Sequence, residues 1–157
     1  MTAQFATAAE PIVFTVAAVP VAQPRQRHRL AKTADGKAFT RNYVDGKHPV
    51  WDFKASVRHA AQAAYSGPPL DVPLVLNLVF VLPRPACLRF KKRPMPRVPY
   101  AGPRNDWDNL GKSVCDALNK ILWTDDGRLA QVHVERWIAA GDEQPHVAVS
   151  IATLPEA

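Results

Sequence analysis

Four stretches of the chain have the hydrophobic pattern of β-strands. Residues 12–19 form an apolar, β-branched run between two prolines, which is typical of a short strand. Residues 72–82 are apolar at nearly every position except Asn77, as expected for a strand in the middle of a sheet that is covered on both faces. Residues 131–138 and 146–151 predict two final strands, separated by the turn-like sequence AGDEQP.

Two other stretches repeat apolar residues at the spacing of an α-helix. Residues 50–65 are rich in alanine and are followed by a Gly-Pro-Pro sequence that ends a helix. Residues 108–121 are amphipathic, with Asp108, Lys112 and Asp116 on one arc and aliphatic side chains on the other. We therefore predict an α+β fold, in which a mixed sheet of about four to six strands is covered by two principal helices.

A basic hairpin is predicted between the first strand and the first helix. The sequence PRQRHRLAKTADGKAFTRNYV, residues 24–44, has an Asp-Gly turn signal between two stretches that can pair. Four cations make the first stretch basic, namely Arg25, Arg27, Arg29 and Lys32. Two interpretations stay open for them: a charged edge strand that resists aggregation, or a contact with phosphates.

The segment from 83 to 105 has the most unusual composition. It holds six of the fifteen prolines and seven Lys or Arg residues, but no acid. Because proline removes backbone donors and disfavours helices and central strands, we predict a loop over residues 84–104. This loop is either a solvated insertion or an arm for a phosphate backbone, with Phe90, Tyr100 and Trp107 available to stack on bases. Its candidate DNA-binding cations are Arg89, Lys91, Lys92, Arg93, Arg97 and Arg104.

Length and composition narrow the class of protein. A chain of 157 residues suffices for one hydrophobic core, so we expect residues 1–157 to form one domain. Its apolar runs are too short to cross a bilayer and it begins without a secretory leader pattern, so we expect a cytosolic protein. The net charge of +6 favours a polyanionic partner without identifying it. Cys87 and Cys115 lack metal-binding spacing and are predicted to be reduced structural thiols.

Acids are concentrated in one window of this basic chain. Five of the 14 acidic residues lie between positions 106 and 126, namely Asp106, Asp108, Asp116, Asp125 and Asp126. Each has an ordinary explanation: Asp108 can cap a helix, Asp116 can pair with Lys112 or Lys120, and the sequence DDG can form a turn. None of these explanations requires the acids to occur together.

Metal chemistry does explain why the acids occur together. If the chain enters the second helix in an extended conformation, Asp106 and Asp108 point to the same side. Converging carboxylates raise one another's pKa, and Mg²⁺, a hard cation that prefers oxygen ligands, relieves this repulsion. Such an ion can activate a water for attack on phosphorus, while the ammonium group of Lys112 stabilises the transition state.

The same residues resemble a family signature. The pattern Asp106-x-Asp108-Asn109-x-x-Lys112-x-x-x-Asp116-Ala117-Leu118, followed by Trp123-x-Asp125-Asp126, is similar to that of the RusA-type Holliday junction resolvases, or crossover junction endodeoxyribonucleases. These are small phage- and prophage-associated enzymes. The order of the other elements between residues 11 and 153 also fits the family. Asn105 departs from it, because a proline often precedes the first aspartate.

The resemblance implies a RusA-like fold and a junction-cleaving activity in DNA recombination and repair. It assigns Asp106, Asp108 and Asp126 as catalytic, metal-binding aspartates and Lys112 as the catalytic lysine. It also implies a homodimer that nicks opposed strands of a four-way junction with Mg²⁺, or with Mn²⁺ as a substitute. Two alternatives stay open: a nuclease for other branched DNA such as flaps or forks, and a catalytically silent DNA-binding protein.

Overall fold

The computed structural model describes residues 10–155 and contains a mixed five-stranded sheet. Its strands lie in the order β1-β7-β4-β6-β5. Strand β4 pairs with β6 in parallel and with β7 antiparallel, which confirms the predicted mixed sheet. The bounds are Ile12–Val16 for β1, Leu74–Leu82 for β4, Val98–Pro99 for β5, Leu129–Ile138 for β6 and His146–Thr153 for β7. The expected lack of a secretory leader concerns residues 1–14, of which residues 1–9 lie outside the described range.

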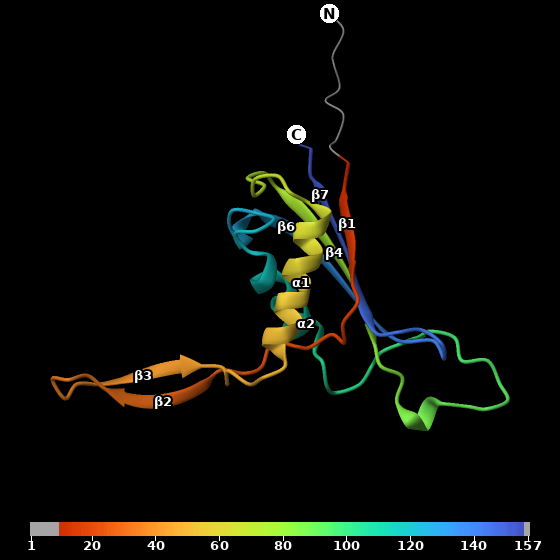
Figure 1. Cartoon of the computed structure of the whole chain (residues 1–157), viewed down its shortest axis with the longest axis horizontal. Helices are drawn as coiled ribbons and strands as arrows, with labels where there is room; N and C mark the ends of the chain where they lie inside the picture. Colours follow the sequence, from red (N-terminus) through yellow and green to blue (C-terminus); the bar gives the residue numbers. More distant parts are fainter. Residues whose placement is uncertain (1–9, 156–157) are drawn as a thin grey trace, which may run out of the picture.

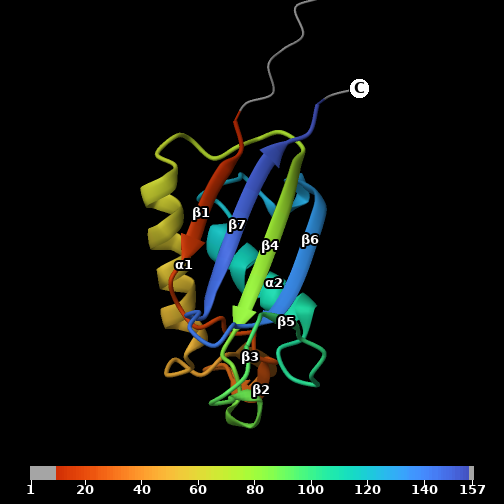
Figure 2. The same ribbon diagram turned by 90° about the vertical axis from the view of Figure 1, so that its right-hand side faces the viewer.

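Two helices pack side by side on one face of this sheet (Figure 2). They are α1, Val50–Ala64, and α2, Trp107–Leu118, close to the predicted ranges. Alternate residues of β4 point toward them and are completely buried: Leu74, Leu76, Leu78 and Phe80. Burial of each such side chain stabilises the fold by about 1.5–3 kcal/mol. This single core fixes α2, and with it the acidic segment, against the sheet.

The expectation that β4 is covered on both faces was wrong. Both helices lie on one side, and the outward residues Val75, Asn77 and Val79 are only partly buried. Val13 of the edge strand β1 is 63% exposed on that open face. The sequence pattern gave the wrong expectation because valines fill the outward positions of β4. The alternation of apolar and polar residues that marks a strand with one covered face is therefore hidden.

The predicted basic hairpin is confirmed as a separate two-stranded ribbon. Strand β2, Arg27–Lys32, pairs antiparallel with β3, Ala38–Tyr43. Its turn uses Gly36 in the left-handed region with φ of 78°, where glycine is favoured. The ribbon projects sideways from the body of the molecule (Figure 1).

Both basic segments leave the same end of the molecule. The ribbon follows β1 and the proline-rich loop follows β4, and both strands run toward the end where α2 begins (Figures 1 and 2). The start of α2 therefore lies between the two basic segments. In residues 10–155, no helix has the length and apolar character needed to cross a membrane.

Candidate active site on helix α2

A sharp backbone turn leads into α2. Asn105 has a left-handed φ of 53°, a conformation that asparagine tolerates better than most residues. Its carbonyl accepts a hydrogen bond of 3.1 Å from the Arg136 guanidinium on β6, which fixes the turn against the sheet. Asp106 is the N-cap and the helix begins at Trp107. The predicted extended entry was wrong for Asp108, which already lies in the first helical turn.

The carboxylates of Asp106 and Asp108 do not cap the helix in the usual way. Asp106 occupies the N-cap position, but its side chain makes no capping hydrogen bond. Asp108 accepts only from the amide of the next residue, Asn109, at 2.9 Å. Both residues are exposed. The free amides and the dipole at the helix N-terminus partly offset the two negative charges. Their oxygens thus face solvent at a place that tolerates anions.

Lys112 is left without an acidic partner. Asp116 pairs with Lys54 of α1, with 3.5 Å between Nζ and Oδ2, so the expected pairing of Asp116 with Lys112 or Lys120 was wrong. Lys54 is only 5% exposed and comes from a different helix, which sequence spacing within α2 cannot reveal. Within residues 10–155, Lys112 takes part in no ion pair. Its exposed ammonium group is available for a phosphate.

Asp126 is held by a hydrogen bond from Trp123, in the segment that follows α2. The indole nitrogen of the fully buried Trp123 donates a hydrogen bond of 2.8 Å to Asp126 Oδ1. Burial, together with the negative charges of Asp126 and Asp116, raises the pKa of the Cys115 thiol to about 12. Asp126 therefore lies near Cys115, which is about 10 Å further along the helix axis than Asp108.

The next turn of the chain is formed by Asp125. Its carboxylate accepts from the Gly127 amide at 2.8 Å and caps the 3₁₀ helix Asp126–Arg128. The interpretation of this sequence as a turn is thus confirmed, and Asp125 has a local structural role. Its neighbour Asp126 stays exposed.

The two carboxylates at the start of α2 suit a magnesium ion, which does not need a closed cage of protein ligands. No group of three or more His, Cys, Asp or Glu side chains in the described part of the chain is placed to hold a metal ion. Asp106, Asp108 and Asp126 are accordingly not gathered into one three-carboxylate cluster. Mg²⁺ usually keeps several waters and takes one or two carboxylates together with substrate phosphates. Asp106 and Asp108, exposed and in no ion pair within residues 10–155, match that requirement.

The root of the ribbon, residues 23–26 just before β2, lies beside α2. A hollow of about 430 Å³ lies between this root and α2, lined by Gln23, Pro24, Arg25, Gln26, His28, Asn109, Lys112 and Asp116. The backbone N–H of Gln23 donates to the backbone carbonyl of Asn109 at 2.9 Å, which ties the root to α2. Gln23 Oε1 is buried and has no hydrogen-bond partner among the described residues. No motif in the sequence points to Gln23, because only the fold brings it beside α2.

The cations predicted to bind DNA fall into two groups. On the ribbon and its root, Arg25, Arg27, Arg29 and Lys32 are all exposed. In the proline-rich loop, Arg97 pairs with Glu143 and Arg93 lies 3.5 Å over the Phe90 ring. The remaining loop cations are exposed, namely Arg89, Lys91, Lys92 and Arg104.

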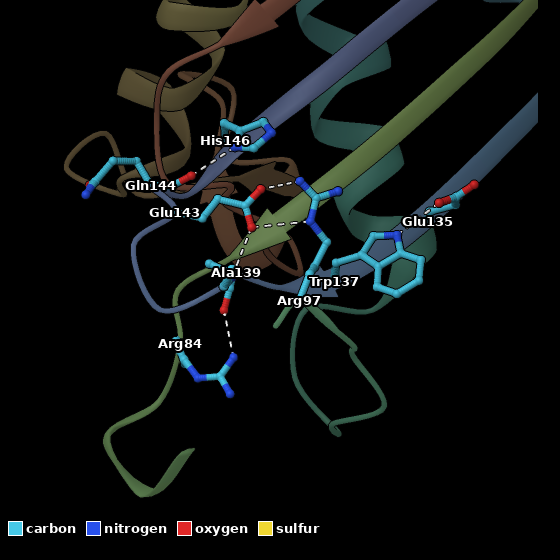
Figure 3. Close-up of polar contacts among 9 residues, drawn as sticks. Arg84, Arg97, Glu135, Trp137, Ala139, Glu143, Gln144 and His146 are labelled. Atoms are coloured by element: carbon cyan, nitrogen blue, oxygen red, sulfur yellow. Dashed lines mark hydrogen bonds and ion pairs between the residues drawn. The ribbon is translucent and has the colours of Figure 1, made fainter. Parts of the chain in front are cut away.

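A cation that the sequence did not single out holds the loop in place. Arg84 is only 8% exposed and donates to the carbonyls of Leu88, Pro96 and Ala139 at 2.7 to 3.0 Å. Figure 3 shows the bond to Ala139. The ion pair between Arg97 and Glu143 lies beside it (Figure 3). The long loop is therefore pinned to the end of the sheet by its own side chains.

Comparisons with known proteins match most of the chain to a known family. The family model described as endodeoxyribonuclease RusA matches residues 18–152, which include the ribbon, both helices and the acidic segment. An uncharacterized protein of Bacillus subtilis (strain 168), YqaN, is 29% identical over 147 residues, covering 89% of this chain and 94% of that protein.

Proposed function

Because the chain belongs to the RusA family of endodeoxyribonucleases, we propose that it is a Mg²⁺-dependent enzyme that resolves four-way DNA junctions. The observation that supports this most directly is the polar face of α2. Within residues 10–155, it combines two carboxylates and, one turn further on, a lysine that form no ion pair, beside a hollow that the basic root of the ribbon shares. Residues 1–157 would form one endonuclease domain, working in the cytosol.

The residues of α2 would divide the work of phosphodiester hydrolysis. Nucleases of this family generally depend on a divalent metal, and Asp106 and Asp108 would hold it, with Asp126 as a third candidate ligand. When bound, a Mg²⁺ or Mn²⁺ ion would activate water and neutralise negative charge on the phosphate. Lys112 would place its ammonium group against the same phosphate and stabilise the charge that develops in the transition state.

Substrate binding is assigned to the cations around this end of the molecule. Arg25 lines the hollow beside Lys112, so it can hold the phosphate next to the cleaved one. The exposed cations of the ribbon and the loop extend this surface, namely Arg27, Arg29, Lys32, Arg89, Lys91, Lys92, Arg93 and Arg104. Arg97 is the weakest member of the predicted set, because Glu143 already neutralises it.

Two cuts in a four-way junction call for two active sites, and a homodimer with two-fold symmetry supplies them. The open face of the sheet supports such a pairing. Val13, Val75 and Val79 lie on this face, and no helix of the described chain covers it. A second copy placed there would bury these side chains and leave the α2 sites on the outside.

The experiment that tests the proposed function compares neighbouring carboxylates. Asp108→Asn and Asp126→Asn should abolish cleavage of a four-way junction but keep or tighten binding, because the variants lose metal affinity and some repulsion of phosphates. Asp125→Asn is the matched control: its amide oxygen can still cap the 3₁₀ helix, so cleavage should persist. Unimpaired cleavage by Asp108→Asn would remove that residue from the mechanism. Equal cleavage of flaps would favour a general branched-DNA nuclease.

A further inference from the structure

The β2–β3 ribbon has two chemically different faces. Side chains alternate along each strand, so the observed register sorts them without ambiguity. One face carries Arg27 and Arg29 from β2 together with Phe39, Arg41 and Tyr43 from β3. The other face carries mostly neutral side chains, among them Leu30 and Thr40. Three guanidinium groups are thus presented on the same side, next to two aromatic rings.

An unfavourable pair lies at the centre of this arginine face. Arg29 and Arg41 are direct cross-strand partners, and like charges placed directly opposite each other destabilise a sheet. Within residues 10–155 neither of them forms an ion pair, and the only acid between positions 25 and 43 is Asp35 at the turn. The face therefore lacks the negative charge that would balance it inside this chain.

Nothing in the body of the described chain covers the arginine face. Eleven of the twelve residues of β2 and β3 are exposed, and Ala31 is the one partly buried position. Phe39 is 46% exposed and Tyr43 39% exposed. A two-stranded ribbon without a core is at best marginally stable alone. Its face is thus built for a partner, and that partner must be an anion because six cations lie between positions 25 and 43.

The size and position of the ribbon fit duplex DNA. Six residues at about 3.4 Å each give a length of about 20 Å, and a two-stranded ribbon fits the major groove. Its root is tied to α2 by the bond between Gln23 and Asn109, and it shares the hollow with Lys112. A duplex lying along the ribbon would therefore lead toward the carboxylates of α2.

We propose that the arginine face of the ribbon binds the duplex arm that flanks the cleaved branch, with Arg27, Arg29 and Arg41 contacting its phosphates. This inference rests on the proposed function and adds Arg41, Phe39 and Tyr43 to the DNA-contacting surface. The phosphates would separate the charges of Arg29 and Arg41, and the aromatic rings would pack against the sugar edges. The contact would cover about six base pairs, at one phosphate per strand for each 3.4 Å.

The test combines a double variant with junctions of two arm lengths, with binding measured in EDTA over a series of salt concentrations. Arg29→Ala with Arg41→Ala removes two phosphate contacts, so the slope of log affinity against log salt should fall by about two. Affinity for a long-armed junction should fall at least about tenfold. The loss should disappear on a junction whose arms are too short to reach the ribbon. Lys37→Ala with Lys47→Ala, which removes the same charge away from the arginine face, should bind like the wild type.

Three results would overturn the inference. The first is an unchanged salt slope for the arginine variant, and the second is an equal loss on the short-armed junction. The third is dissociation of a dimer by the arginine variant in sedimentation, which would make the ribbon a contact between copies. Suppose that the wild type cleaves no branched DNA while the arginine variant still shows a smaller salt slope than the wild type on the long-armed junction. In that case the nuclease proposal fails. The ribbon's role in DNA binding would then be supported independently.

Discussion

The β2–β3 ribbon and the proline-rich loop are both basic, but they use their cations differently. In the loop, Arg84 donates hydrogen bonds to three backbone carbonyls, and Arg97 forms an ion pair with Glu143. On the ribbon, Arg29 and Arg41 face each other with no acid between them. Two of the seven cations in the loop segment hold the loop in place, whereas the ribbon's charges are left for a partner.

This difference shows why the net charge of a segment is a poor guide to its role. An arginine that donates to carbonyls keeps its formal charge but is removed from the binding surface. The available cations of the loop are therefore fewer than the sequence suggests. We expect the ribbon to dominate DNA affinity and the loop's buried arginine to dominate stability.

Removing the ribbon should have the largest effect. If a short Gly/Ser linker replaces residues 27–43, affinity for four-way junctions should fall by about 100-fold or more, because several phosphate contacts are lost. The midpoint of urea unfolding should change little, since the ribbon buries almost nothing against the core. Binding titrations and urea curves on the same sample check both parts. A large loss of stability would contradict the division of roles.

Arg84→Ala should show the opposite behaviour. Leaving three carbonyls without their donor should lower the free energy of unfolding by about 2–4 kcal/mol. Arg84→Lys should rescue little, because an ammonium group cannot reproduce the planar fork. Arg104→Ala, an exposed arginine of the same loop, is the control and should change stability by less than about 0.5 kcal/mol. A wild-type unfolding curve for Arg84→Ala would show that the loop does not depend on this side chain.

Charge reversal in the exposed part of the loop should have an intermediate effect on binding. Lys91→Glu with Lys92→Glu should weaken junction binding by about tenfold and flatten its salt dependence, if these side chains contact phosphates. Affinity measured at several salt concentrations gives both quantities. An unchanged salt slope would exclude this part of the loop from the DNA contact and leave the ribbon alone.

The smallest effect is expected at the ion pair of the loop. The guanidinium of Arg97 holds the pKa of Glu143 below its usual range. The pair therefore stabilises the fold above the ordinary glutamate pKa, and this contribution is lost as the pH falls through the folded-state pKa. Arg97→Ala should cost less than about 1 kcal/mol at neutral pH, because the pair is partly exposed. The difference from wild type should vanish at low pH; a difference that persists there would point to lost packing instead.

The sequence predicted those elements whose cause is local. Apolar spacing located α1 and α2, and an Asp-Gly turn located the ribbon. Counting outward from a two-residue Asp-Gly turn would have placed Asn42 opposite Arg29, whereas the observed register places Arg41 there. The misses arise from long-range contacts: Lys54 reaches Asp116 across 62 positions, and Gln23 meets Asn109 only because the ribbon's root folds over α2. Arg84 was missed because its acceptors are carbonyls, which leave no trace in a pattern of charges.

The most direct test of the central claim is a cleavage assay with the wild-type protein. Four-way junctions, flaps and linear duplexes are incubated with Mg²⁺ or with EDTA, and the products are separated on a denaturing gel. We predict paired nicks in opposed strands of the four-way junction with Mg²⁺, none with EDTA, and little cleavage of linear duplex. Binding of the junction without any Mg²⁺-dependent nick would contradict the account and leave a DNA-binding protein that does not cut.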